Sequence, residues 1–145
     1  GFDIITGYNY QEKGYRNYMR PKSIKKVPLD SLRIAEKRVW NKIESTKKMP
    51  YIPTVTLNWD PRPWHNAENN FLNRPYYIGF SEESVYKSIK QSLTWINNHQ
   101  RSKNNKLLLI YAWNENGEGS YLTPSKNGDN FLNGVARALK ENRDD

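Results

Sequence analysis

Two glutamates at the end of a short apolar run are the residues best suited to do chemistry. Glu115 and Glu118 stand three positions apart and follow the run at residues 107–110. Such a pair can divide acid–base work, because one carboxyl group protonates a departing oxygen while the other supplies negative charge or a base. Trp113 and Tyr121 place flat apolar rings beside these acids, which suits a sugar ligand. The alternative is a solvated loop with two ordinary surface glutamates.

The position of these acids follows from three predicted strands. Residues 107–110 are Leu-Leu-Leu-Ile, the continuous pattern of a strand buried on both faces. Residues 2–6 and 51–57 are two further strands, rich in β-prone residues. All three end in aromatic and amide or acid residues, namely Tyr8-Asn9, Asn58-Trp59-Asp60 and Trp113-Asn114-Glu115. Parallel strands bring these ends to one edge, where α/β proteins keep their ligands.

A helix is predicted after each strand. The first begins at the N-cap Asp30, and its inward face consists of Leu32, Ala35, Val39, Trp40 and Ile43. The second is capped by Ser81 and buries Val85, Ile89, Leu93 and Ile96. The third is capped by Asp129 and buries Leu132, Val135, Ala136 and Leu139. Residues 11–28 and 67–80 lack periodicity and carry proline, so they are predicted to be loops.

Strand, loop and helix thus recur roughly every 50 residues. A complete (β/α)8 barrel of the TIM type has eight such units and typically about 250 residues. The 145 residues are therefore expected to form a single α/β domain, residues 1–145, of three βα units with parallel strands in the order 1-2-3. This domain would be the C-terminal part of a larger barrel enzyme. Its open sheet would associate with another copy or with the rest of the barrel.

The charge of the chain is uneven. Its formal net charge is +8, and residues 1–48 hold 12 Lys and Arg against 5 Asp and Glu. Much of this excess falls on the first predicted helix, whose outer face would carry Arg33, Lys37, Lys42 and Lys48. A charged outer face is the usual state of a surface helix, although a surface for phosphate or an anionic glycan remains open. No nucleic-acid motif accompanies it, so no nucleic-acid partner is expected.

Several other classes of function lack support in the composition. The chain has no cysteine, which excludes disulfides, thiolate catalysis and Cys-ligated metals. His65 and His99 are too far apart in sequence for a histidine zinc motif, so neither a metal nor another cofactor is expected. No apolar run approaches the about 18 residues that span a membrane. The composition fits a reducing or an oxidising compartment, and the periplasm or cell surface is favoured.

Two motifs carry a resemblance to a known family. The segment Trp113-Asn114-Glu115-x-x-Glu118-Gly119, followed by Tyr121-Leu122-x-Pro124, resembles the WNEW-x-EG-x-x-x-EP signature of the glycoside hydrolase family 99-like barrels. That group includes endo-α-mannosidases and a large bacterial set labelled lipopolysaccharide-biosynthesis glycosyltransferases. Residues 53–64 are similar to the family's second motif, a strand ending in P-G-[WY]-D-x-x-x-R. The chain departs from these patterns at Asn58, Asn116-Gly117 and Thr123.

The resemblance implies a retaining glycoside hydrolase acting on α-mannoside-like linkages or bacterial surface glycans. Glu115 would be the base on the substrate's own 2-hydroxyl, with a 1,2-anhydro sugar as intermediate, and Glu118 would be the general acid/base. The oligosaccharide or polysaccharide would be bound by Asn9, Trp59, Asp60, Arg62, Trp64, Trp113, Asn114 and Tyr121. Alternatively, Trp59 and Trp64 cap the sheet while Asp60 and Arg62 only pair with each other. A glycosyltransferase of polysaccharide biosynthesis and a non-catalytic glycan-binding module are the other functions left open.

Overall fold

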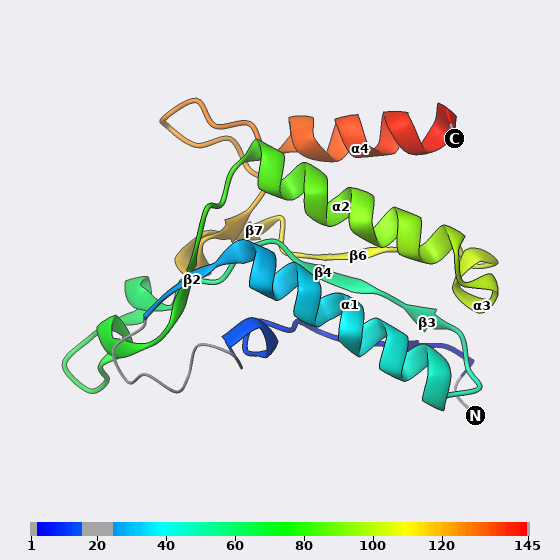
Figure 1. Ribbon diagram of the computed structural model, residues 1–145. Helices are drawn as coiled ribbons and strands as arrows, with labels where there is room; N and C mark the ends of the chain where they lie inside the picture. Colours follow the sequence, from blue (N-terminus) through cyan, green and yellow to red (C-terminus); the bar gives the residue numbers. More distant parts are fainter. Residues whose placement is uncertain (1–2, 16–24, 145) are drawn as a thin grey trace.

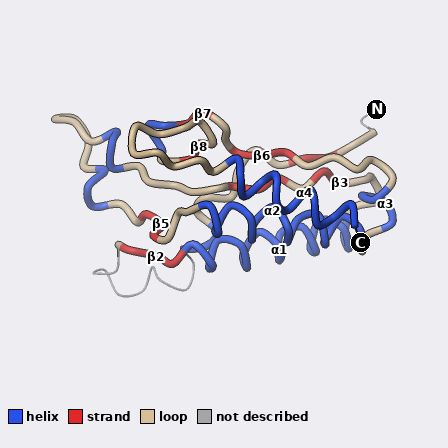
Figure 2. Tube along the Cα trace, turned by 90° about the horizontal axis from the view of Figure 1, so that it is seen from above, coloured by secondary structure: helices blue, strands red, loops and turns tan. Residues whose placement is uncertain are grey.

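The computed structural model describes residues 3–15 and 25–144 as a mixed α/β fold (Figure 1). Its helices are α1 (Leu29–Thr46), α2 (Glu82–Asn97), the short α3 (Gln100–Lys103) and α4 (Leu132–Asp144). Figure 2 shows α1, α2 and α4 on one side of strands β3 and β6. None of the helices in the described ranges is long and apolar enough to cross a membrane.

The three predicted strands pair in parallel. β1 (Ile5–Thr6) pairs with β3 (Tyr51–Ile52), and β4 (Thr54–Thr56) pairs with β6 (Leu109–Tyr111). Only Pro53 separates β3 from β4; proline lacks the N–H that a continuous ladder requires, but its carbonyl accepts the N–H of Leu109 at 3.0 Å. In the segment at residues 51–56, β1 therefore lies beside the first half (β3) and β6 lies beside the second half (β4). The strands of the described ranges do not close into a barrel.

A third parallel pair lies where the sequence predicts loops. β2 (Lys26–Pro28) pairs with β5 (Tyr76–Ile78). Both strands have three residues, which is too short for an alternating pattern to stand out. The same regions also contain the 3₁₀ turns η1 (Lys13–Tyr15) and η3 (Phe71–Asn73). The loop prediction is therefore wrong at these elements, and its residues 16–24 lie outside the described part of the chain.

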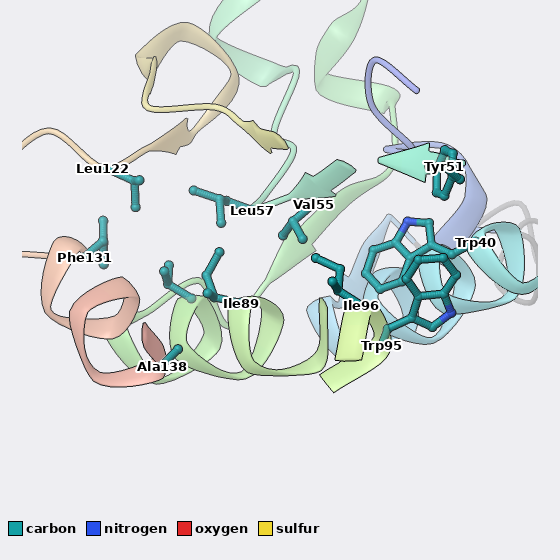
Figure 3. Packing of buried hydrophobic residues seen from close by; sticks show 11 residues of the cluster. Trp40, Tyr51, Val55, Leu57, Ile89, Trp95, Ile96, Leu122, Phe131 and Ala138 are labelled. Atoms are coloured by element: carbon teal, nitrogen blue, oxygen red, sulfur yellow. The ribbon is translucent and has the colours of Figure 1, made fainter. Parts of the chain in front are cut away.

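The main core lies between the helices and the central strands (Figure 3). At one end Trp40, Tyr51 and Trp95 pack together, with Trp95 edge-on to both other rings. At the other end Leu122 and Phe131 close the core against α4. Val55, Leu57, Ile89, Ile96 and Ala138 fill the space between.

The run at residues 107–110 is not buried on both faces as its sequence predicts. Leu107 and Leu109 are 51% and 43% exposed, whereas Leu108 and Ile110 pack against the core. Alternate residues of a strand point to opposite faces, and the helices cover only one of them. A strand covered on one side thus carries apolar residues on its open face as well.

The three predicted helices are present, but only Ser81 is confirmed as a cap, and not every predicted face is buried. Ser81 caps α2 through a capping box with Ser84, and Val85 and Ile89 are fully buried as expected. Phe131, just before α4, is buried, as are Gly134 and Ala138 within the helix; Val135 is half-buried, while Leu132, Ala136 and Leu139 are exposed. A Cβ on Gly134 would lie 2.4 Å from the backbone oxygen of Glu82, so this glycine lets α4 approach α2 closely and sets its rotation. Asp129 is not the cap; it accepts the hydroxyl of Ser125 at 2.8 Å.

The N-cap position of helix α1 lies two residues earlier than predicted, and the helix buries charged side chains. Pro28 precedes it, and Asp30 lies in its first turn and pairs with Arg33. Arg33 is buried rather than on the outer face. Glu36 is fully buried as well, and its Oε1 accepts the backbone N–H of Thr56 at 2.7 Å. Burial raises the pKa of Glu36 to about 8, so this carboxyl group holds a proton at neutral pH.

Candidate active site

The two glutamates lie on a hairpin that follows the end of β6. Its strands are β7 (Asn114–Glu115) and β8 (Ser120–Tyr121), which pair antiparallel and are joined by the 3₁₀ turn η4 (Asn116–Glu118). The hairpin folds back on the strand end through buried Ser120. The Ser120 hydroxyl donates to the Tyr111 carbonyl and accepts the N–H of Ala112, both at 3.0 Å. The peptide bond between Tyr111 and Ala112 is cis.

Glu118 turns back towards the sheet and is held there by Tyr111. The Tyr111 hydroxyl donates a hydrogen bond to Oε2 of Glu118. Burial raises the pKa of Glu118; the hydrogen bond from Tyr111 opposes this shift, and the negative charge of Glu115 adds to it. Burial also raises the pKa of Tyr111, so its hydroxyl stays protonated and acts as a donor. Glu118 therefore keeps its proton to a higher pH than a free glutamate.

The side chains of Glu115 and Asn114 lie on opposite faces of the hairpin. Glu115 is the cross-strand partner of Ser120, and Asn114 is the partner of Tyr121. Cross-strand partners share a face, so Glu115 lies on the side that faces the strand end. The ring of Tyr121 packs against Phe80 and Phe131, with centroids 5.6 and 5.4 Å away. The Tyr121 ring is thus part of the core edge and lies on the other face from Glu115.

The second motif contacts the loop that carries Glu118. Asn58 Nδ2 donates to the carbonyl of Gly119 at 2.9 Å, and the N–H of Asp60 donates to the carbonyl of Glu118 at 2.8 Å. Gly119 has φ of 64°, and a Cβ there would lie 3.1 Å from Asn58 Nδ2. Glycine adopts this left-handed conformation without steric cost. Two strand ends far apart in sequence thereby meet around one acid.

Asp60 and Arg62 form a bidentate ion pair beside this loop. Arg62 Nε lies 2.8 Å from Asp60 Oδ1, and Nη2 lies 2.6 Å from Oδ2. The guanidinium group also stacks over the ring of Tyr76, 3.6 Å from its centroid. This ion pair agrees with the alternative in which Asp60 and Arg62 pair with each other. The backbone hydrogen bond from Asp60 to Glu118 nevertheless places the pair next to the candidate site.

The remaining predicted binding residues lie in three different places. Trp64 and Trp113 are 52% and 64% exposed, and Trp64 lies against the turn, 3.5 Å from the position of a Cβ on Gly117. Trp59, the neighbour of Asp60 in the chain, instead lines a separate cavity. Asn9 is half-buried after β1, and its neighbour Tyr10 donates its N–H to Thr56 Oγ1 at 3.0 Å.

Sequence reasoning missed the residues that hold the acids in place. Tyr111, Ser120 and Asn58 make the hydrogen bonds that fix the hairpin and Glu118. Tyr111 is the last residue of β6. A tyrosine at the end of a strand and a few residues before two acids indicates a hydrogen-bond donor for one of those acids. Ser120 and Asn58 offer no such signal, because their partners are backbone groups. Within the described ranges no three His, Asp or Glu side chains lie close enough to hold a metal ion.

One comparison with known proteins shows the family of this chain. Residues 6–135 match the family described as Glycosyltransferase WbsX, and the chain belongs to that family. Its description points to a glycan-related, carbohydrate-active enzyme. No curated protein and no solved structure matches the chain.

Proposed function

We propose that the protein is a retaining glycoside hydrolase acting on α-mannoside-like linkages or bacterial surface glycans. The observation that carries this proposal is the pairing of Glu118 with Tyr111 beside Glu115. An acid whose pKa is raised by burial, next to a second carboxyl group, is the combination that glycoside cleavage needs. The protein would be a single α/β domain of a larger barrel of the glycoside hydrolase family 99-like type.

In the first half of the reaction Glu118 donates its proton to the departing glycosidic oxygen. Glu115 takes the proton of the sugar's 2-hydroxyl, and that oxygen attacks C1 as the bond to the leaving group breaks. The product is a 1,2-anhydro sugar. In the second half Glu118, now a carboxylate, takes a proton from water, which attacks C1. The C1–O2 bond breaks, and Glu115 returns its proton to O2, so the configuration is retained and both acids are restored.

The sugar would be bound by side chains around the hairpin. Trp64 and Trp113 expose ring faces of the kind that stack on the C–H surface of a sugar. Asn9, Asn114, Asp60 and Arg62 would contact hydroxyl groups. The ring of Tyr121 packs on Phe80 and Phe131, so Tyr121 would contact the sugar only through its hydroxyl group.

Glycosyl transfer is the second candidate, and the description of the family favours it. A transferase would use Glu115 or Glu118 as a base on the acceptor hydroxyl and would need a nucleotide sugar as donor. Transfer from a nucleotide sugar to an acceptor glycan, without hydrolysis of aryl glycosides, would support this function over the first.

The test uses Glu118→Gln and Glu115→Gln in the protein at its full natural length. Loss of general acid–base assistance lowers the rate by about 10²- to 10⁴-fold. Glu118→Gln should lose this factor on natural linkages and recover much of it on an aryl glycoside with a good leaving group, which needs little protonation. Glu115→Gln should not recover. Small and equal effects of both substitutions on every glycoside would refute the catalytic pair and favour a glycan-binding module.

A further inference from the structure

A cavity of about 520 Å³ opens beside the candidate active site. Tyr15, Trp59 and Phe71 form its aromatic lining, and Lys13 and Arg74 lie at the same cavity. Its volume falls within the range of about 300–1,000 Å³ that ligand sites occupy. Ring faces combined with a few charged groups are the usual lining of a site for a small polar ring.

The aromatic wall of this cavity is already in place. Tyr15 donates its hydroxyl to the carbonyl of Pro75 at 3.0 Å and stacks on Tyr77 at 4.8 Å between centroids. Tyr77 in turn donates its hydroxyl to the carbonyl of Gln11 at 2.6 Å and its N–H to the carbonyl of Trp59 at 3.0 Å. A ligand would therefore meet an ordered wall and would not bear the cost of ordering it.

One short segment contacts both the cavity and the loop that carries Glu118. Trp59 and Pro61 line the cavity, and Asp60 between them donates its N–H to the carbonyl of Glu118. The two sites are thus placed to hold successive residues of one glycan.

The charges at the cavity favour an anionic ring. Lys13 and Arg74 are exposed, and neither forms an ion pair with any residue in the ranges 3–15 and 25–144. Glu12 is the one acid among the lining residues that the structure describes, so this lining holds two cationic residues and one acidic residue. Arg62, by contrast, is already neutralised by Asp60. Cations without protein partners beside an aromatic wall attract a ligand that carries its own negative charge.

We propose that this cavity is a second sugar subsite, which takes an acidic sugar residue of the uronate type. The proposal rests on the proposed function in that the acidic residue belongs to the glycan held at Glu115 and Glu118. Trp59 and Phe71 stack on the sugar ring, and Lys13 and Arg74 pair with its carboxylate. The subsite selects acidic polysaccharide over neutral polysaccharide.

The test compares two disaccharides that differ only in charge. The indole N–H signal of Trp59 in NMR spectra, assigned by its loss in Trp59→Phe, is followed during titration with α-1,4-digalacturonate and with neutral α-1,4-galactobiose. The Glu118→Gln protein is used so that no turnover occurs. The acidic disaccharide should bind about tenfold more tightly at low salt, because two charge-assisted contacts are added, and this preference should shrink as salt is raised.

Matched substitutions locate the effect. Lys13→Gln with Arg74→Gln should abolish the preference for the acidic disaccharide and leave weak binding of the neutral one. Substitution of the exposed Lys103 on α3, which does not line the cavity, by Gln should change neither affinity. Equal affinity for both disaccharides in the unsubstituted cavity would overturn the proposal, and so would a preference that survives the double substitution.

A third ligand separates an acidic sugar from a nucleotide. Uridine diphosphate also combines rings with negative charge, and tighter binding of it than of digalacturonate at Trp59 would overturn the proposal in favour of a sugar-donor site. Binding is measured without turnover, so its outcome is independent of the rate experiment on Glu115 and Glu118. Selective binding of digalacturonate without hydrolytic activity would refute the hydrolase and keep the subsite.

Discussion

The hydroxyl of Tyr111, at the end of β6, donates a hydrogen bond to the carboxyl group of Glu118 on the following hairpin. This contact joins the last residue of the sheet to the acid at the centre of the candidate site. It fixes Oε2 of Glu118 and leaves Oε1 for another partner. The rotamer of the acid and its affinity for a proton therefore both depend on a tyrosine that does not itself titrate near neutral pH.

Substitution of Tyr111 by phenylalanine should raise the pKa of Glu118 further, because the hydrogen bond that stabilises its carboxylate is lost while its burial remains. NMR titration of the Glu118 side-chain carboxyl carbon measures this shift directly. In an active enzyme the basic limb of the rate profile should move to higher pH. The free energy of unfolding should fall by about 1 kcal/mol. Tyr121→Phe, on the same hairpin, is the control and should leave the Glu118 titration unchanged.

The glycines of the turn should differ sharply in their tolerance of a side chain. Gly119→Ala should destabilise the protein by about 1–2 kcal/mol, since Gly119 is left-handed and its Cβ would crowd Asn58. Gly117→Ala should be tolerated, because its Cβ would make an ordinary contact with Trp64 at 3.5 Å. Thermal unfolding tests this difference: the melting temperature should fall in Gly119→Ala and stay close to that of the parent in Gly117→Ala. Equal melting temperatures would show that the turn does not have this conformation in solution.

Glu36 should make the stability of the protein depend on pH. Its pKa is about 8 in the folded state, against 4.5 for an unperturbed glutamate, so the folded state binds the proton more tightly. The stabilisation is complete below about pH 4.5 and is lost as the pH rises through about 8, at no more than about 1.4 kcal/mol per pH unit.

Glu36→Gln should remove that dependence, because glutamine keeps an acceptor for the Thr56 N–H and has no charge to bury. Urea unfolding at pH 5, 7 and 9 compares the two proteins. The variant should gain stability over the parent as the pH increases. A parent protein that is as stable at pH 9 as at pH 5 would contradict a buried, protonated Glu36.

Gly134→Ala should destabilise the protein although alanine is the better helix former by about 1 kcal/mol. The added Cβ would lie 2.4 Å from the backbone oxygen of Glu82 and 2.9 Å from the backbone nitrogen of Tyr86. Forcing α4 away from α2 costs about 1–3 kcal/mol. Lys140→Ala, exposed on the same helix, is the matched control and should stay within about 0.5 kcal/mol of the parent in chemical unfolding.

The comparison of α2 with α4 shows which features the sequence could predict. The start and inner face of α2 follow from local signals, namely the cap Ser81 and the spacing of Val85 and Ile89. The face of α4 depends on how closely two helices approach at Gly134, which is a property of the packed pair. Apolar spacing alone therefore pointed to Leu132 and Leu139, which are exposed.

The candidate site divides in the same way. The strand ends and the acid-bearing loop could be predicted, because an apolar run that gives way to Glu115 and Glu118 marks an edge of a parallel sheet. The direction of each side chain could not, since it depends on contacts between distant segments. Trp59 turns to a separate cavity for this reason, and Tyr121 turns to Phe80 and Phe131.

The hydrogen bond from the N–H of Asp60 to the carbonyl of Glu118 makes one amide a reporter for the whole hairpin. This amide can exchange with deuterium only when the loop lifts from the end of β4, so its protection factor measures the free energy of that local opening. A ligand that bridges the hairpin and the second motif would slow this exchange. A ligand confined to the cavity around Trp59 and Phe71 would slow it only if the two sites are energetically coupled, which makes the Asp60 amide a measure of that coupling.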